Sequence, residues 1–85
     1  MSKNYNDKDL KDQGNKLFAV RNYEGAIECY TKAILKNPNV PCYYTNRALC
    51  YLNQKRWVQA SQDSKLALER DPNQVKGHFY LGKYN

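Results

Sequence analysis

Apolar and small residues recur near the start of the chain at the spacing of an amphipathic helix. Four of them stand at i, i+4, i+7 and i+8 and therefore share one helical face: Leu10, Gly14, Leu17 and Phe18. A second stripe of apolar residues with helical spacing runs over residues 26–34. The segment from Arg21 to Tyr23 separates the two stripes. The pattern therefore predicts two helices, at residues 9–20 and 24–36, joined by a short turn.

The same pattern then returns along the chain. Three pairs of small or special residues share one sequence separation, 34 positions: Ala26 and Ala60, Ala33 and Ala67, and Pro38 and Pro72. A fixed period of this length is typical of repeat proteins. The second unit predicts helices at residues 41–53 and 58–70, and a fifth helix begins near Asn73. Pro38 ends the second helix because the residue before a proline avoids the helical region.

These units predict an all-α fold in which antiparallel helix pairs stack into a superhelix. The first unit covers about residues 7–40, the second about 41–74, and a partial third about 75–85, with residues 1–6 as a flexible N-terminus. All 85 residues then form one domain. Repeat proteins usually need about three units and a polar cap. We therefore expect this chain to be a fragment of a longer protein.

Charge and hydropathy narrow the classes of partner. The chain carries 14 Lys and Arg against 8 Asp and Glu, but Lys55 and Arg56 are the only adjacent cations. A nucleic-acid-binding stripe is denser and interleaved with aromatic residues or glycines, so we expect no nucleic-acid partner. No apolar run approaches the ~20 residues of a membrane span. The polar start, Met1 to Asn6, lacks the hydrophobic core of a signal peptide. These features predict a cytosolic or nuclear protein with no membrane partner.

Catalytic and metal-binding patterns are missing from the sequence. The three cysteines, Cys29, Cys42 and Cys50, match no zinc spacing and are expected to be small, half-buried thiols in a reducing compartment. His78 has no second histidine or aspartate at a ligand spacing and is expected to pack. No Gly-rich phosphate loop is present. We expect no cofactor, no metal and no catalysis by this chain.

Four polar residues fall on the first helices of successive units: Lys11, Asn15, Asn46 and Lys76. Lys11 and Asn15 are i, i+4 neighbours on one helical face. Asn46 follows Asn15, and Lys76 follows Asn46, by roughly one repeat each. If the first helices line a concave groove, two ammonium groups and two carboxamides meet there. Such a set suits the carboxylates of a peptide C-terminus with an acidic last residue.

The chain resembles the tetratricopeptide-repeat family. The residues that carry the resemblance are Gly14, Ala26, Tyr30, Ala33 and Pro38 in the first unit and Ala48, Tyr51, Ala60, Ala67 and Pro72 in the second. The second unit departs from the family pattern at Ser64, where an aromatic residue is expected, and Ser61 stands opposite Ile27. The resemblance covers nearly the whole chain.

The strings Leu10–Asn15 and Tyr44–Ala48 are similar to the carboxylate clamp of co-chaperone repeat domains. That clamp binds the Glu-Glu-Val-Asp tails of cytosolic heat-shock chaperones. The resemblance implies that Lys11, Asn15 and Asn46 hold the terminal carboxylate. It also implies that Lys76 reaches the Asp side chain of the tail or the same terminus.

Typical clamps carry a fifth, basic residue where this chain has Tyr80. With Phe79 beside it, this stretch resembles the repeat domain of chaperone-linked U-box ubiquitin ligases. The resemblance implies that Phe79, Tyr80, Leu49 and Cys42 line pockets for the apolar residues that precede the tail's end. It also implies a parent ligase that binds a ubiquitin-conjugating enzyme through a region outside this chain. Two alternatives remain: a parent phosphatase or prolyl isomerase with the same clamp, and a repeat scaffold that binds an internal segment or nucleic acid.

Overall fold

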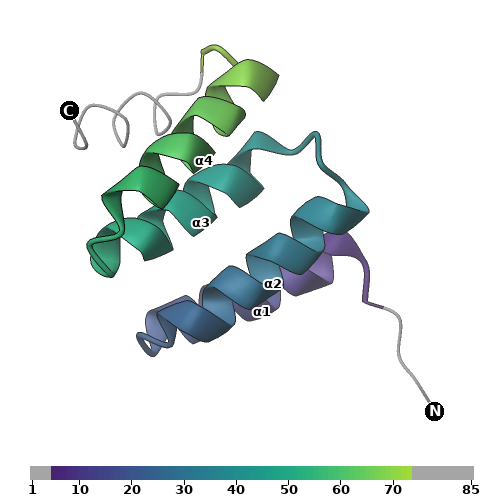
Figure 1. Ribbon diagram of the computed structural model, residues 1–85. Helices are drawn as coiled ribbons and strands as arrows, with labels where there is room; N and C mark the ends of the chain where they lie inside the picture. Colours follow the sequence, from purple (N-terminus) through teal and green to yellow (C-terminus); the bar gives the residue numbers. More distant parts are fainter. Residues whose placement is uncertain (1–4, 74–85) are drawn as a thin grey trace.

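The computed structural model describes residues 5–73, which form four α-helices and no strand (Figure 1). The helices are α1 (Asp7–Ala19), α2 (Tyr23–Lys36), α3 (Pro41–Asn53) and α4 (Trp57–Arg70). Each of these bounds lies within two residues of the predicted one, so the all-α fold expected from the periodicity is confirmed. The fifth predicted helix lies outside the described residues.

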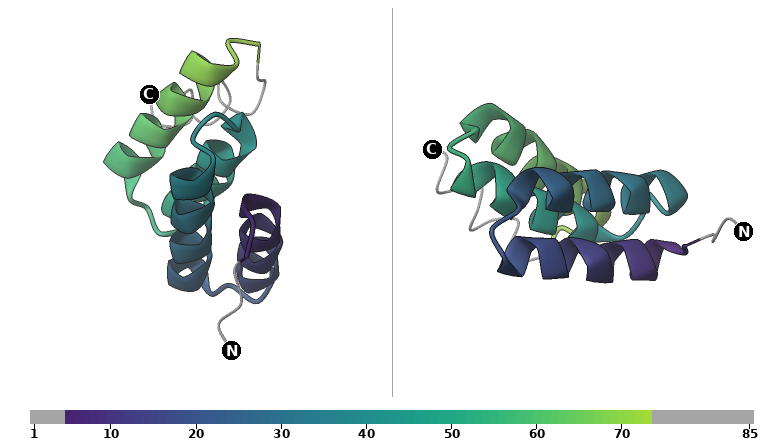
Figure 2. Two further views of the ribbon diagram at one scale, coloured as in Figure 1. Left: turned by 90° about the vertical axis from the view of Figure 1, so that its right-hand side faces the viewer. Right: turned by 90° about the horizontal axis from the view of Figure 1, so that it is seen from below.

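The helices pack in chain order as two antiparallel pairs. Helix α1 packs on α2 and α3 packs on α4, while α2 also contacts α3 and so joins the two pairs. Figures 1 and 2 show α2 lying next to both α1 and α3. Helix α2 is therefore shared by both halves of the described structure.

Asparagines begin the two helices of the first pair. The Asn6 side chain accepts a hydrogen bond from the Asp9 backbone N–H at 2.8 Å, and the Asp9 carboxylate accepts one from the Asn6 N–H at 3.4 Å. This reciprocal capping box satisfies amide groups that the first turn of a helix leaves without partners. The Asn22 side chain caps α2 by accepting from the Gly25 N–H at 3.0 Å. Tyr5, just before α1, packs against the core.

The turns within the two helix pairs, α1–α2 and α3–α4, adopt the same left-handed conformation at equivalent residues. Arg21 has a φ of 64° between α1 and α2. Lys55 stands at the equivalent place in the second repeat and has a φ of 59° between α3 and α4. Both lie in the left-handed region, which non-glycine residues enter only at a cost. The period of the sequence is therefore reproduced in the backbone of the turns.

Small residues stand where the helices approach most closely. Five alanines have no exposed surface: Ala26, Ala33, Ala48, Ala60 and Ala67. At Gly14, an added Cβ would lie 2.6 Å from Cε1 of the buried Tyr30 ring. That distance is shorter than van der Waals contact, so the Tyr30 ring reaches α1 because position 14 has no side chain.

The buried residues form two clusters along α2. Leu10 of α1, Ala33 of α2 and Tyr43 of α3 make the first cluster. Ala26 and Tyr30 of α2 make the second cluster with Cys50 of α3. Each cluster contains residues of both helix pairs, so the two repeats pack against each other rather than folding as separate hairpins.

Candidate functional site

The predicted site residues lie on three parts of the chain, of which the structure describes two. Lys11 and Asn15 are on α1, and Cys42, Asn46 and Leu49 are on α3. The other three, Lys76, Phe79 and Tyr80, lie outside the described residues. No hydrogen bond or ion pair joins Lys11, Asn15 and Asn46 to one another in the part of the chain that the structure describes. We call these three residues the clamp surface.

Individual side chains from the first halves of α1 and α3 meet. Leu10, which precedes Lys11, shares a buried cluster with Tyr43, and Cys42 packs against the same cluster. The Tyr43 hydroxyl also donates to the Asp7 carboxylate at 2.5 Å. Asn46 follows Cys42 by one helical turn. Lys11 and Asn46 therefore both lie next to residues of the same inter-helix cluster.

The Asn15 carboxamide is held from the core side by a buried tyrosine. The Tyr30 hydroxyl donates to Asn15 Oδ1 at 2.6 Å, and only 2% of Tyr30 is exposed, whereas Asn15 lies at the surface. Burial raises the pKa of Tyr30, so its hydroxyl keeps its proton and remains a donor. With the carbonyl oxygen engaged by Tyr30, the amide nitrogen and its two hydrogens remain for other partners.

Lys11 carries an ammonium group that is only loosely paired. Its Nζ lies 3.7 Å from the Asp12 carboxylate, and the two side chains are 32% and 65% exposed. Exposed ion pairs of this kind contribute roughly 0–1 kcal/mol, so an incoming carboxylate can replace Asp12 at little cost. Lys11 is thus available to a ligand.

Asn46 differs from Asn15 because its side chain has no hydrogen-bond partner among residues 5–73. Its two sequence neighbours are both anchored. The Thr45 hydroxyl donates to the Cys42 carbonyl at 3.1 Å, and the Arg47 guanidinium binds Asp63 and Thr31. The backbone at Asn46 is therefore fixed while both ends of its carboxamide stay available.

Arg47 connects three helices from its position beside Asn46. Its guanidinium donates to both oxygens of Asp63 on α4 at 2.7 Å and to the Thr31 hydroxyl on α2 at 2.9 Å. The Asp63 side chain is only 4% exposed. Burial raises the pKa of Asp63, and the Arg47 guanidinium, which lowers it, offsets part of that effect.

The polar roles of Tyr30, Arg47 and Asp63 were not predicted from the sequence. Tyr30 was expected only as the core aromatic of the first repeat, because helical periodicity reports which face is buried and not where a hydroxyl points. For Arg47 and Asp63 a signal did exist. Both charges fall among apolar or small residues on inward faces of their helices, and charges in such places are rarely buried unless paired.

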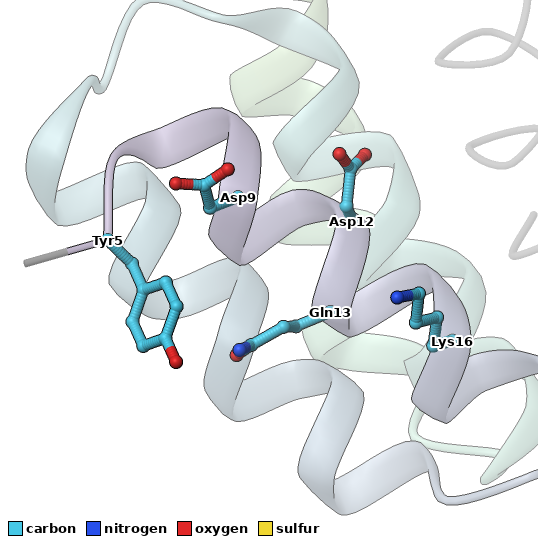
Figure 3. Close-up of a pocket in the computed structure, with 5 residues that line it drawn as sticks. All are labelled: Tyr5, Asp9, Asp12, Gln13 and Lys16. Carbon is cyan, nitrogen blue, oxygen red and sulfur yellow. The ribbon is translucent and has the colours of Figure 1, made fainter. Parts of the chain in front are cut away.

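A separate pocket lies on another part of the α1 surface. It has a volume of about 240 Å³ and is lined by Tyr5, Asp9, Asp12, Gln13 and Lys16. Figure 3 shows the Tyr5 ring and the Gln13 side chain extending to one side of α1, with the Asp9 and Asp12 carboxylates on the other. The pocket contains none of the clamp-surface residues.

Two further features of residues 5–73 bear on partners. No helix in this range is long and apolar enough to cross a membrane. No three side chains of His, Cys, Asp or Glu in this range are grouped so that they could hold a metal ion. The three cysteines are free thiols, and Cys50 is fully buried.

Comparison with known proteins places the repeats in a family. Residues 29–62 match a sequence profile of the tetratricopeptide repeat. The second TPR domain of Spaghetti (RPAP3), solved with the HSP90 peptide SRMEEVD, superposes with a TM-score of 0.90 at 32% identity. That alignment covers 92% of this chain and 72% of the RPAP3 chain. The chain belongs to the tetratricopeptide-repeat family. The resemblance proposed from the period of the sequence is confirmed.

Curated relatives resemble this chain through a small part of their length. E3 ubiquitin-protein ligase CHIP of Arabidopsis thaliana is 44% identical over 73 residues, which are 86% of this chain and 26% of the ligase. Dynein axonemal assembly factor 4 of Rattus norvegicus is 52% identical over 60 residues, which are 71% of this chain and 14% of that protein. The chain thus spans about a quarter or less of these relatives, and the likeness concerns the repeat domain alone.

Proposed function

We propose that this chain is a co-chaperone docking module that captures the C-terminal Glu-Glu-Val-Asp tail of cytosolic heat-shock chaperones. The tail binds at the clamp surface of Lys11, Asn15 and Asn46, and Lys76 completes the set. The observation that carries the proposal is the Tyr30–Asn15 hydrogen bond, which leaves the amide donors of Asn15 available one turn from Lys11. The peptide held by the RPAP3 domain ends in the same four residues.

The chemistry of the clamp surface suits a carboxylate. A carboxylate offers only acceptors, Lys11 offers only donors, and the Asn15 carbonyl oxygen already accepts a hydrogen bond from Tyr30. Asn46 retains both a donor and an acceptor, which suits the terminal peptide group of the tail, where an N–H stands close to the carboxylate. The net charge of +6 also attracts an acidic tail over longer distances.

The expected affinity is moderate. Each charge-assisted hydrogen bond contributes roughly 1.5–3 kcal/mol. Ordering a flexible tail and immobilising two long lysine side chains oppose this gain. The balance predicts dissociation constants on the order of micromolar.

Apolar contacts are proposed to select the residues before the tail's end. Leu49 and Cys42 on α3 are half-buried on the helix that also carries Asn46. Phe79 and Tyr80 are proposed to complete these pockets from the third unit. An aromatic residue at Tyr80, in place of a basic one, favours an apolar side chain in the bound peptide.

The proposal also concerns the kind of protein to which this docking module belongs. Similarity to CHIP supports a ubiquitin ligase that binds its ubiquitin-conjugating enzyme through a region outside this chain and acts in cytosolic protein quality control. A clamp-bearing phosphatase or prolyl isomerase, or a scaffold for an internal segment, is the alternative. A U-box in the complete protein supports the ligase, and its replacement by another catalytic domain overturns it.

One titration tests the docking function. A peptide ending in Glu-Glu-Val-Asp with a free carboxylate, and the same peptide amidated, are titrated into the chain by isothermal calorimetry. We expect amidation to weaken binding by at least about tenfold, because it removes the negative charge that Lys11 and Asn15 bind. Equal binding of the two peptides would instead indicate recognition of an internal segment.

A further inference from the structure

Tyr30 links the buried core to the exposed side chain of Asn15. The ring lies in the core cluster with Ala26 and Cys50, and 2% of the residue is exposed. Its hydroxyl nevertheless reaches across from α2 to Asn15 Oδ1 on α1 at 2.6 Å. A hydrogen bond at this distance is well formed, and it fixes one end of a side chain that would otherwise turn freely in solvent.

Gly14 makes this reach possible. A Cβ at position 14 would stand 2.6 Å from Cε1 and 2.9 Å from Cδ1 of Tyr30. The ring therefore lies directly against the α1 backbone, one residue before Asn15. Any larger residue at position 14 would displace the ring and, with it, the hydroxyl.

The second repeat provides an internal comparison. One period after Gly14, Asn15 and Tyr30 stand Ala48, Leu49 and Ser64. Where leucine replaces the asparagine, serine replaces the tyrosine, and the Ser64 hydroxyl turns back to the Ala60 carbonyl at 2.9 Å. Helices α3 and α4 thus pack as an antiparallel pair without a phenol at this position. The tyrosine hydroxyl accompanies the asparagine and is not needed to build a helix pair.

We propose that Tyr30 is a positioning residue that holds the Asn15 carboxamide with its nitrogen toward the ligand, so that this position acts as a donor and selects a carboxylate. This inference rests on the proposed function. The two ends of a carboxamide are nearly equal in size, so without a partner either end can face the ligand. A flipped Asn15 would present its oxygen to the carboxylate, where two acceptors repel each other. The Tyr30 oxygen could accept from the flipped nitrogen, but the buried Tyr30 proton would then lose Asn15 Oδ1 as its acceptor.

Substitution of Tyr30 by Phe tests the proposal, because it removes the hydroxyl and keeps the ring. Tyr44→Phe is the matched control, since Tyr44 is also buried and its hydroxyl donates to the Pro38 carbonyl outside the clamp surface. We expect Tyr30→Phe to weaken binding of the free-carboxylate peptide about tenfold and to leave the amidated peptide unchanged. Tyr44→Phe should change both affinities by less than about twofold.

A double-mutant cycle separates positioning from packing. In an Asn15→Ala background, Tyr30→Phe should have no further effect on the affinity for the free-carboxylate peptide, because no carboxamide remains to be oriented. A tenfold loss that persists in this background would mean that the hydroxyl acts through the core, and it would overturn the proposal. Full affinity in Tyr30→Phe alone would overturn it as well.

A measurement on the unliganded chain keeps this inference distinct from the docking function. Tyr30→Phe should move the side-chain amide ¹H–¹⁵N signals of Asn15, while Tyr44→Phe should leave them in place. Unmoved Asn15 signals overturn the positioning role whatever the peptide does. If these signals move but free and amidated peptides bind equally, the docking function fails and the orientation of Asn15 stands.

Discussion

Arg47 and Asp63 face each other with both nitrogens of one guanidinium edge on both oxygens of the carboxylate, each at 2.7 Å. The pair ties α3 to α4, and the remaining guanidinium nitrogen donates to Thr31 on α2 at 2.9 Å. Arg47 also directly follows Asn46. The same side chain therefore joins the two repeats and fixes the backbone of a clamp-surface residue.

Asp63→Ala should be strongly destabilising. It leaves the Arg47 guanidinium largely buried without its counter-charge, which costs about 3–5 kcal/mol in free energy of unfolding. Glu69→Ala is the control, because the Glu69 carboxylate is 67% exposed and among residues 5–73 pairs only with Arg70, so its removal should cost about 0–1 kcal/mol. Urea unfolding followed by circular dichroism measures the free energy of unfolding of both variants. Equal decreases would show that the buried Arg47–Asp63 pair stabilises the fold no more than an exposed pair does.

Lys11→Ala should weaken binding of the free-carboxylate peptide by about 10–100-fold, which corresponds to about 1.4–2.8 kcal/mol. The reason is the loss of an ammonium group whose present partner, Asp12, holds it only at 3.7 Å. Lys16→Ala removes the same charge from α1 at a position in the separate pocket and should have little effect. If calorimetry finds the same peptide affinity for the two variants, Lys11 does not bind the peptide carboxylate.

Gly14→Ala should reduce both stability and peptide affinity. The new methyl group would meet the Tyr30 ring at 2.6 Å, and overpacking of this kind costs about 1–3 kcal/mol. The helical preference for alanine over glycine offsets at most about 1 kcal/mol of that loss. Displacement of the ring should also break the Tyr30–Asn15 hydrogen bond.

Gly25→Ala is the matched control for Gly14→Ala. There the added methyl group would meet the Asn22 side chain at 2.8 Å, and this capping side chain can move away. Thermal unfolding and the peptide titration should both be affected less than in Gly14→Ala. Unaltered affinity in Gly14→Ala would contradict the coupling between position 14 and the carboxylate site.

Acid should destabilise the fold partly through Asp7. The hydrogen bond from Tyr43 lowers the pKa of Asp7 below its ordinary value, so the folded state holds this proton less tightly than the unfolded chain does. The resulting stability is present above about pH 4 and is lost as the pH falls through the lowered pKa. Urea unfolding between pH 7 and pH 2.5 measures this effect. The free energy of unfolding should fall less with acid in Tyr43→Phe than in the unmodified chain, and an equal fall in both would contradict the role of Asp7.

Much of the fold was predictable because the hydrophobic period is visible within short segments of the sequence. The repeat of the whole unit then indicates the same helices a second time. The predicted helix at residues 41–53 agrees with α3 at both ends, since Pro41 and the end of the apolar stripe define them. The predicted start of α1 is two residues late. Asn6 and Asp9 form the capping box that sets it, and this signal is readable in the sequence.

The polar supports of the site were not predictable in the same way. Tyr30 and Asn15 lie on different helices, far enough apart along the chain that no periodic pattern relates them. Ser64, a departure from the family pattern, is fully buried and satisfies its hydroxyl within its own helix. Such contacts depend on how two helices are rotated about their axes relative to each other. The spacing of apolar residues shows only which face of a helix is buried.

The shared cluster of Leu10, Ala33 and Tyr43 makes α2 a spacer between the two helices that carry the clamp surface. At this point α2 contributes only the side chain of Ala33, a single methyl group with no exposed surface, beside Leu10 of α1 and Tyr43 of α3. Enlarging Ala33 would therefore stretch the span from Lys11 to Asn46 without altering either residue. In the proposed docking function, the size of anion that fits across that span would thus depend on an apolar side chain that never touches the anion.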